Sequence, residues 1–143
     1  MTIRPELPEY IRTLVRGEHE ANDQLEAQLD GTGWEGFPRF LAALFFISVD
    51  RRFGEVGTPA DVIKFVAGLR TDLSNGGPEI DAEAAETLII SIIDPSINYA
   101  IEQNMIGKIQ AATIYKVLTE EDLSDSDLDA ILAEAVQLAS RPG

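Results

Sequence analysis

The chain has 143 residues, of which 45% are hydrophobic, and its formal net charge is minus 14. A chain of this length can bury roughly two thirds of its unfolded surface as one domain, without a disulfide or a metal. The negative charge argues against nucleic acid and against an anionic membrane surface as partners, because contacts with phosphate depend on lysine and arginine. The absence of cysteine excludes disulfides, thiolate metal ligands and a cysteine nucleophile.

The charge is unevenly distributed. Residues 1–70 hold eight basic and eleven acidic side chains, whereas residues 71–143 hold three and fourteen. Most of the negative charge therefore lies in the second half of the chain. The N-terminal residues contain no apolar stretch of signal-peptide length, and we expect a cytoplasmic location.

The first 33 residues show helical spacing of apolar side chains. Pro8 is suited to the first position of a helix, and Gly17 interrupts the pattern, which returns more thinly over residues 18–29. These residues form either two helices or one kinked helix. The two glycines of segment 30–33 predict its end.

A strongly apolar segment follows. From Phe40 to Val49 the only polar residue is Ser48, and a helix that is apolar on every side belongs in the middle of a bundle. The segment is too short to span a membrane. Arg51 and Arg52 would lie in the last turn, where the helix dipole favours positive charge. We therefore predict a central buried helix at about residues 38–53.

The later helices are marked by local start and stop signals. Thr58 before Pro59 predicts an N-cap and a first helical position, and Asp81 predicts a second N-cap. The segment Asn75-Gly76-Gly77-Pro78 predicts the end of the first of these helices, and Pro95 the end of the second. The remaining elements are a short helix or turn at 96–104, a helix at 105–118, and a last helix at 127–140 with Ser126 as its N-cap.

These elements predict an all-α fold for residues 1–143. The expected architecture is a single-domain bundle of six or seven helices around the central helix at about 38–53. The strict alternation of apolar and polar residues that strands need is absent, and no segment repeats.

Residues 40–66 resemble a group of uncharacterised small acidic all-helical proteins from actinobacteria. The likeness lies in Phe45-Phe46, Asp50-Arg51-Arg52-Phe53, Thr58-Pro59-Ala60-Asp61-Val62-Ile63 and Phe65-Val66. Because these are mostly core and capping residues, the resemblance implies a helical fold and no particular activity.

The side chains needed for catalysis are scarce. His19 is the only histidine, and a hydrolytic triad would need it as the base, oriented by a carboxylate such as Asp23. That pair lies in a highly polar stretch, where a solvated helix face explains it. No particular pair of carboxylates is marked for acid and base catalysis. We therefore predict no catalytic residues and no cofactor.

Two segments resemble calcium loops in part. Asp125 to Asp129 reproduces the first three alternating ligands of an EF-hand, but Ala130 and Val136 stand where the loop needs Gly and Glu. A second partial match, from Asp72 to Glu83, lacks a side-chain ligand at its fifth position. We predict no metal site.

The run from Glu120 to Asp129 contains six carboxylates and no positive charge. One interpretation is a docking surface for a basic partner. The other is a solvated surface in which Asp127 and Asp129 stabilise the start of the last helix. The candidate partner-binding residues that capping leaves unexplained are Glu120, Glu121, Asp122 and Asp125.

Two further groups are candidates for partner binding. Trp34, the only tryptophan, lies in a Gly-rich loop, where it either anchors an interface or covers the end of the core. Asp50, Arg51 and Arg52 form either a salt-bridge cluster at a helix end or a site. In a site, the planar fork of arginine would suit a carboxylate or a phosphate.

The sequence favours a non-catalytic protein-interaction or regulatory module with an acidic C-terminal half. Such a module binds a protein partner, for example a basic one, or self-associates. One alternative is an antitoxin or immunity protein that blocks a basic partner. Another is a small carboxylate-based enzyme or a ligand-binding helical bundle, which a pocket lined by converging carboxylates or arginines would favour.

Overall fold

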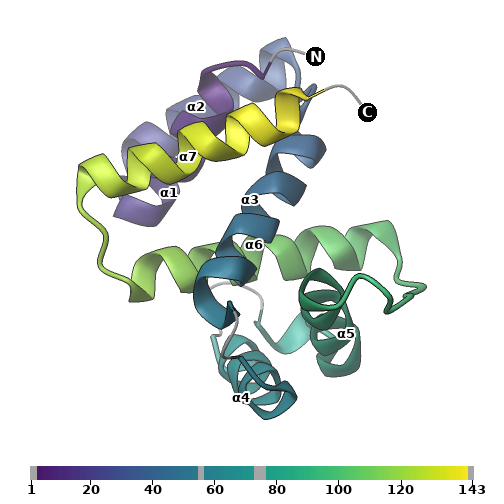
Figure 1. The fold of residues 1–143 in the computed structure, drawn as a ribbon. Helices are drawn as coiled ribbons and strands as arrows, with labels where there is room; N and C mark the ends of the chain where they lie inside the picture. Colours follow the sequence, from purple (N-terminus) through teal and green to yellow (C-terminus); the bar gives the residue numbers. More distant parts are fainter. Residues whose placement is uncertain (1–2, 55–56, 73–76, 142–143) are drawn as a thin grey trace. The chain divides into compact units, whose positions relative to one another are not determined.

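The computed structural model describes residues 3–54, 57–72 and 77–141, and these ranges contain seven α-helices, one short 3-10 helix and no strand (Figure 1). The all-α prediction is confirmed. The elements are α1 (Glu6–Arg16), α2 (His19–Thr32), α3 (Phe37–Phe53), α4 (Pro59–Arg70), η2 (Gly77–Glu79), α5 (Ala82–Ile93), α6 (Gln103–Glu120) and α7 (Asp125–Ser140).

The chain divides into two compact units. Unit 1 comprises residues 1–44 and 118–143, and unit 2 comprises residues 45–117. The division falls inside α3 and α6, so that each of these helices contributes to both units. The arrangement as a single domain stays a prediction.

Unit 1 is built on α1, which packs against both α2 and α7. Leu7, Leu29 and Leu128, one from each helix, are fully buried. A polar group joins α1 to α2: the buried Asn22 Nδ2 donates to the backbone oxygen of Tyr10 at 2.9 Å and to Thr13 Oγ1 at 3.1 Å. The α1–α2 contact is therefore fixed by hydrogen bonds as well as by apolar burial.

Residues 6–32 form two helices. Gly17 ends α1 in the left-handed conformation (φ 71°), which glycine adopts without a steric penalty. The prediction that Pro8 begins the first helix is wrong, because Pro5 is the N-cap and Pro8 is the third helical residue. Proline is tolerated there because the first four N–H groups of a helix have no intrahelical partner.

The predicted end of the second helix, within residues 30–33, is confirmed. The helix continues through Gly31 and ends at Thr32, and Gly33, whose φ is 113°, is its C-cap. Arg4 supports this end, because its guanidinium donates to the Gly33 oxygen and to Thr32 Oγ1, both at 2.9 Å. A contact from a distant part of the sequence therefore supports the end that the local glycines predict.

The predicted central helix is confirmed as α3. Phe40, Leu44, Phe45 and Val49 are fully buried or nearly so, and Ser48 is buried among them. The helix is not buried on every side, because Ala42 is exposed and Phe46 is 48% exposed.

Unit 2 confirms both predicted N-caps. Thr58 Oγ1 accepts from the Asp61 backbone N–H at 3.2 Å, and Asp61 Oδ2 accepts from the Thr58 backbone N–H at 3.0 Å, which completes a capping box. Asp81 caps α5 through the N–H of Ala84 at 3.1 Å. The predicted stop at residues 75–76 lies outside the described residues. Within unit 2, α4 packs against α5 and η2.

The segment predicted as a short helix or turn at 96–104 contains only a turn before α6 begins at Gln103. Asp94 Oδ1 accepts from the backbone N–H of Ser96 at 3.1 Å and from its hydroxyl at 2.7 Å. Both hydrogen bonds favour the ionised carboxylate, and they lower the pKa of Asp94. Residues 94–100 are all exposed.

Candidate functional site

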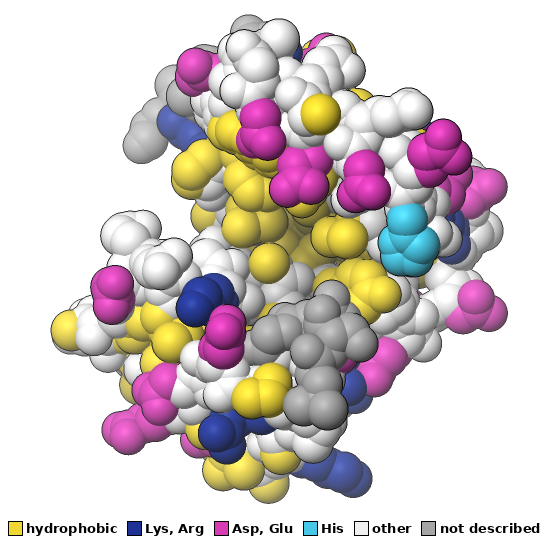
Figure 2. Space-filling view, turned by 180° about the vertical axis from the view of Figure 1, so that it is seen from behind, with side chains coloured by type: hydrophobic (Ala, Val, Ile, Leu, Met, Phe, Trp, Pro, Cys, Tyr) yellow, Lys and Arg dark blue, Asp and Glu magenta, His cyan; other side chains and the backbone are white. Residues whose placement is uncertain are grey.

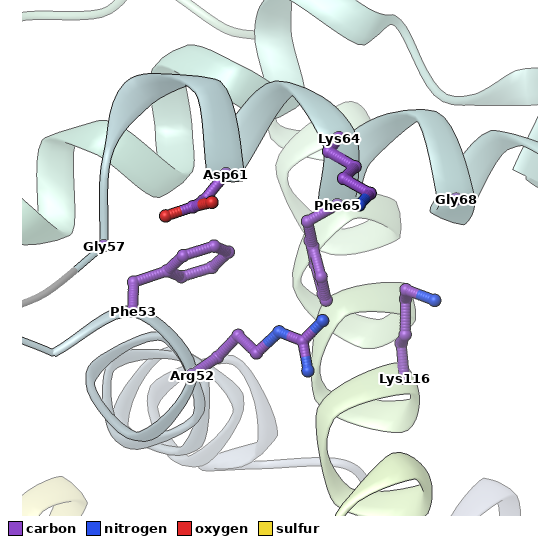
Figure 3. Close-up of a pocket in the computed structure, with 8 residues that line it drawn as sticks. All are labelled: Arg52, Phe53, Gly57, Asp61, Lys64, Phe65, Gly68 and Lys116. Carbon is purple, nitrogen blue, oxygen red and sulfur yellow. The ribbon is translucent and has the colours of Figure 1, made fainter.

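A pocket of about 400 Å³ lies in unit 2, next to the end of α3 (Figure 3). Three elements supply its side chains: the last residues of α3, one face of α4, and α6. Together with the segment before α4, they place eight residues around it: Arg52, Phe53, Gly57, Asp61, Lys64, Phe65, Gly68 and Lys116.

The pocket is positively charged within a strongly acidic chain. Among the lining residues that the structure describes, Arg52, Lys64 and Lys116 carry three positive charges, and Asp61 carries a negative charge. Unit 2 as a whole has six basic and ten acidic residues, a net charge of minus 4, so that the charge of the pocket is opposite to that of its unit. Such a local concentration of positive charge attracts anions.

Phe65 organises two of the three cations. Its side chain is 3% exposed and lies edge-on to Phe53, with ring centroids 5.4 Å apart. The Arg52 guanidinium lies 5.4 Å from the Phe65 centroid, and Lys116 Nζ lies 5.5 Å from it. Both distances are within the range of cation–π attraction. Figure 3 shows the Arg52 guanidinium at the tip of the Phe65 ring and Lys116 to one side of it.

Gly68 makes room for Lys116. A Cβ atom added at Gly68 would lie 3.2 Å from Lys116 Nζ, which is closer than an ordinary contact. Glycine inside a helix costs about 1 kcal/mol relative to alanine. The close approach of the ammonium group gives a physical reason for glycine at this position of α4.

The Asp61 carboxylate is part of the capping box at the start of α4. Its hydrogen bonds with Thr58 hold the pKa of the Asp61 carboxyl group below its ordinary value. The carboxylate therefore remains ionised to acidic pH and reduces the formal charge of the pocket from plus 3 to plus 2. In Figure 3, Asp61 lies near Gly57 and Phe53, on the side of the pocket away from Lys116.

The sequence analysis named one member of this pocket, Arg52, together with Asp50 and Arg51. All three are exposed at the end of α3, and only Arg52 lines the pocket. Lys64 and Lys116 were missed because they lie on two other helices, Lys64 on the next one and Lys116 far along the sequence. The available signal was the scarcity of basic residues in this chain, combined with a glycine inside the helical pattern of α4.

Trp34 belongs to an aromatic cluster in unit 1. Its ring lies edge-on to Tyr10 and Phe37, with centroid distances of 5.2 and 5.1 Å, and its indole N–H donates to Asp30 Oδ1 at 2.8 Å. Burial raises the pKa of Tyr10, and the negative charges of Glu26, Asp30 and Asp23 raise it further. These contacts favour the second interpretation of Trp34, as a cover for the end of the core, and its role in partner binding stays a prediction.

The acidic run also has structural partners. Arg16 Nη2 lies 3.1 Å from Asp125 Oδ1 and donates to the Leu123 backbone oxygen at 2.7 Å. Ser124 caps α7 through the N–H of Asp127, so the prediction that Ser126 is the N-cap is wrong. The helix begins earlier because Arg16, a residue distant in sequence, holds the turn before it.

The remaining acidic candidates lie around the end of α6. Glu120 is its last residue, and Glu121 and Asp122 follow in an exposed turn. Asp122 has a φ of 49°, a conformation in which aspartate is enriched among non-glycine residues. These residues and Trp34 belong to unit 1, whereas residues 50–52 belong to unit 2. The predicted candidates are therefore divided between the two units.

His19 lies exposed at the start of α2, and acidic side chains lie near the single histidine on the face drawn in Figure 2.

Across the described ranges, no three His, Asp or Glu side chains gather as a metal site requires. The partial calcium match at Asp125 lies in the first turns of α7. In the match at Asp72, Ser74 lies outside the described residues. None of the described helices is both long and apolar enough to cross a membrane.

Comparison of the chain with family models, with curated proteins and with solved structures finds no match. The resemblance of residues 40–66 to small acidic helical proteins stays a prediction.

Proposed function

We propose that this protein is a non-catalytic binding module that holds an anionic group in the unit 2 pocket. The observation that carries the proposal is the convergence of Arg52, Lys64 and Lys116 from three helices on a single pocket around Phe65. Cations held against an aromatic ring are already positioned for a ligand, which lowers the entropic cost of binding. The proposal includes a cytoplasmic location, supported by the absence of cysteine.

The proposal is tested by NMR titration of the labelled protein with sodium sulfate and sodium phosphate at constant ionic strength. We expect saturable shifts of the amide signals of Gly57, Phe65 and Gly68. Replacing Lys116 by Gln should weaken binding about tenfold or more, because it removes a charge-assisted contact.

A matched control is Lys108→Gln. Lys108 lies on the same helix, outside the pocket, and its ammonium group lies 3.5 Å from a carboxylate oxygen of Glu79. The Lys108→Gln variant should bind the anions within about twofold of the affinity of the unmodified protein, since long-range charge effects are screened at physiological salt. Equal losses in the two variants, or no saturable shifts at all, would overturn the proposal.

A second candidate function is the docking of a basic protein on the acidic run. It is supported by the charge of unit 1, which has five basic and fifteen acidic residues and a net charge of minus 10. An antitoxin or immunity protein is the narrower form of this proposal. In a pull-down at low and moderate salt, the unmodified chain should recover a partner protein. The variant Glu120→Gln/Glu121→Gln/Asp122→Asn should fail to recover it. Recovery of no partner by the unmodified chain would count against this function.

A further inference from the structure

The formal charge of the described lining residues points to a dianion. Arg52, Lys64, Lys116 and Asp61 together carry plus 2. A carboxylate ligand would neutralise half of this charge, whereas a phosphate monoester carries about minus 1.5 to minus 2 at pH 7. Arginine is also suited to phosphate, because its planar fork can donate two parallel hydrogen bonds to two oxygens.

The size of the pocket points to a ligand larger than a single phosphate group. Its volume of about 400 Å³ lies within the range of small-molecule sites, about 300 to 1,000 Å³. A phosphate group held by the cations would fill only part of this space. The remainder would accommodate the organic part of an ester.

The two sides of the pocket differ in polarity. The ring of Phe65 lies near Arg52 and Lys116, whereas Asp61 lies toward Gly57 on the other side (Figure 3). An ionised carboxylate only accepts hydrogen bonds. It would repel a second phosphate group and attract a hydroxyl or an amino group.

Building on the proposed function, we propose that the pocket binds a hydroxylated phosphate monoester, with its phosphate on Arg52, Lys64 and Lys116 and a hydroxyl group donating to Asp61. The ligand class is therefore a small phosphorylated polyol.

Calorimetric titration with glycerol 3-phosphate and propyl phosphate tests the role of the hydroxyl groups. These esters have the same three-carbon chain and phosphate group, and only the first carries hydroxyls. We expect glycerol 3-phosphate to bind about tenfold more tightly, the effect of one hydrogen bond to a charged group. In Asp61→Asn the preference should fall to about threefold or less, because the acceptor loses its charge.

A pH series tests the dianion. Affinity for glycerol 3-phosphate should rise between pH 5 and pH 7.5, as the ester loses its second proton near pH 6, while affinity for sulfate should stay level. Asp61 does not titrate in this window, because its pKa is lowered. Arg52→Lys should weaken phosphate binding severalfold, since it keeps the charge and loses the fork.

The outcomes separate this inference from the proposed function. If sulfate and both esters bind in the pocket with equal affinity, the proposal of a hydroxylated ester as ligand is wrong. The proposal of an anion-binding module is then retained. If none of these anions shifts the signals of the pocket residues, both are overturned. A preference for glycerol 3-phosphate that survives Asp61→Asn unchanged would overturn the role of Asp61.

Discussion

The two units share one use of basic residues and differ in a second. Arg4 and Arg16 of unit 1 donate to backbone oxygens at the ends of helices, and Arg70 of unit 2 does the same for the Ile80 oxygen at 3.0 Å. In unit 2, Arg52 and Lys116 also lie against an aromatic ring beside a pocket. The difference teaches that basic residues serve structure in both units, whereas the cluster in unit 2 is a candidate for ligand binding within an acidic chain.

The largest expected effect tests whether the two units are energetically separate. Leu7 in unit 1 and Ile89 in unit 2 are both fully buried, and replacing either by Ala should cost about 2 to 5 kcal/mol in the free energy of unfolding. Thermal unfolding followed by amide NMR signals of each unit is the measurement. Separate units would show a lowered midpoint only in the unit that carries the change. A common shift in both would instead support the single-domain prediction.

A smaller effect is expected from Arg16→Gln. The change removes a charged donor from the Leu123 oxygen and from Asp125, and should lower the free energy of unfolding by about 1.5 to 3 kcal/mol. The matched control is Arg12→Gln, which removes an arginine of the same helix that pairs with Glu9. Such partly exposed pairs contribute about 0 to 1 kcal/mol. Equal destabilisation in denaturant unfolding would contradict a structural role specific to Arg16.

Gly68→Ala should separate stability from binding in unit 2. Alanine favours the helix by up to about 1 kcal/mol, and the tip of a flexible lysine side chain can move from the added methyl group at little cost. We therefore expect a small rise in thermal stability and a severalfold loss of phosphate affinity, because Lys116 is displaced. Unchanged affinity in calorimetry would show that the position of Lys116 does not matter for binding.

The smallest effect concerns alkaline pH in unit 1. The pKa of Tyr10 is raised above its ordinary value of about 10. The folded protein therefore holds the phenolic proton of Tyr10 more tightly than the unfolded chain does. The stability that this difference contributes is lost as pH rises through the pKa that Tyr10 has in the folded state. Unfolding of the unmodified protein should become easier above about pH 10, and Tyr10→Phe should flatten this dependence. An identical pH profile in the two proteins would exclude Tyr10 as the cause.

Local signals predicted much of the fold. The composition of residues 40–49 was sufficient for α3, and Thr58 and Asp81 were sufficient for the starts of α4 and α5, because a cap acts within three residues of itself. The N-cap of the last helix was placed two residues too late, at Ser126. Arg16 reaches the start of this helix from a distant part of the sequence, and such a tertiary contact leaves no mark on a local pattern.

The candidate site was less predictable than the fold. Arg52 was recognised because it lies in a conspicuous charged cluster, but the interpretation of that cluster depended on what surrounds it. Phe65 was interpreted only as a core residue, and Lys116 is one of two lysines in a helix that also carries several other polar residues. A pocket is defined by the packing of α3, α4 and α6, and this packing is not encoded at any fixed spacing.

The exposed segment at residues 94–100 has a practical consequence for the pocket. A protease that cuts after Tyr99 would break the backbone between α5 and α6 without cutting through either helix. Arg52 and Lys64 would then lie on one fragment and Lys116 on the other. A ligand that binds only the assembled form stabilises it by mass action. The association of the two fragments of the nicked protein would therefore become tighter as the ligand concentration rises, and measuring it would report ligand binding.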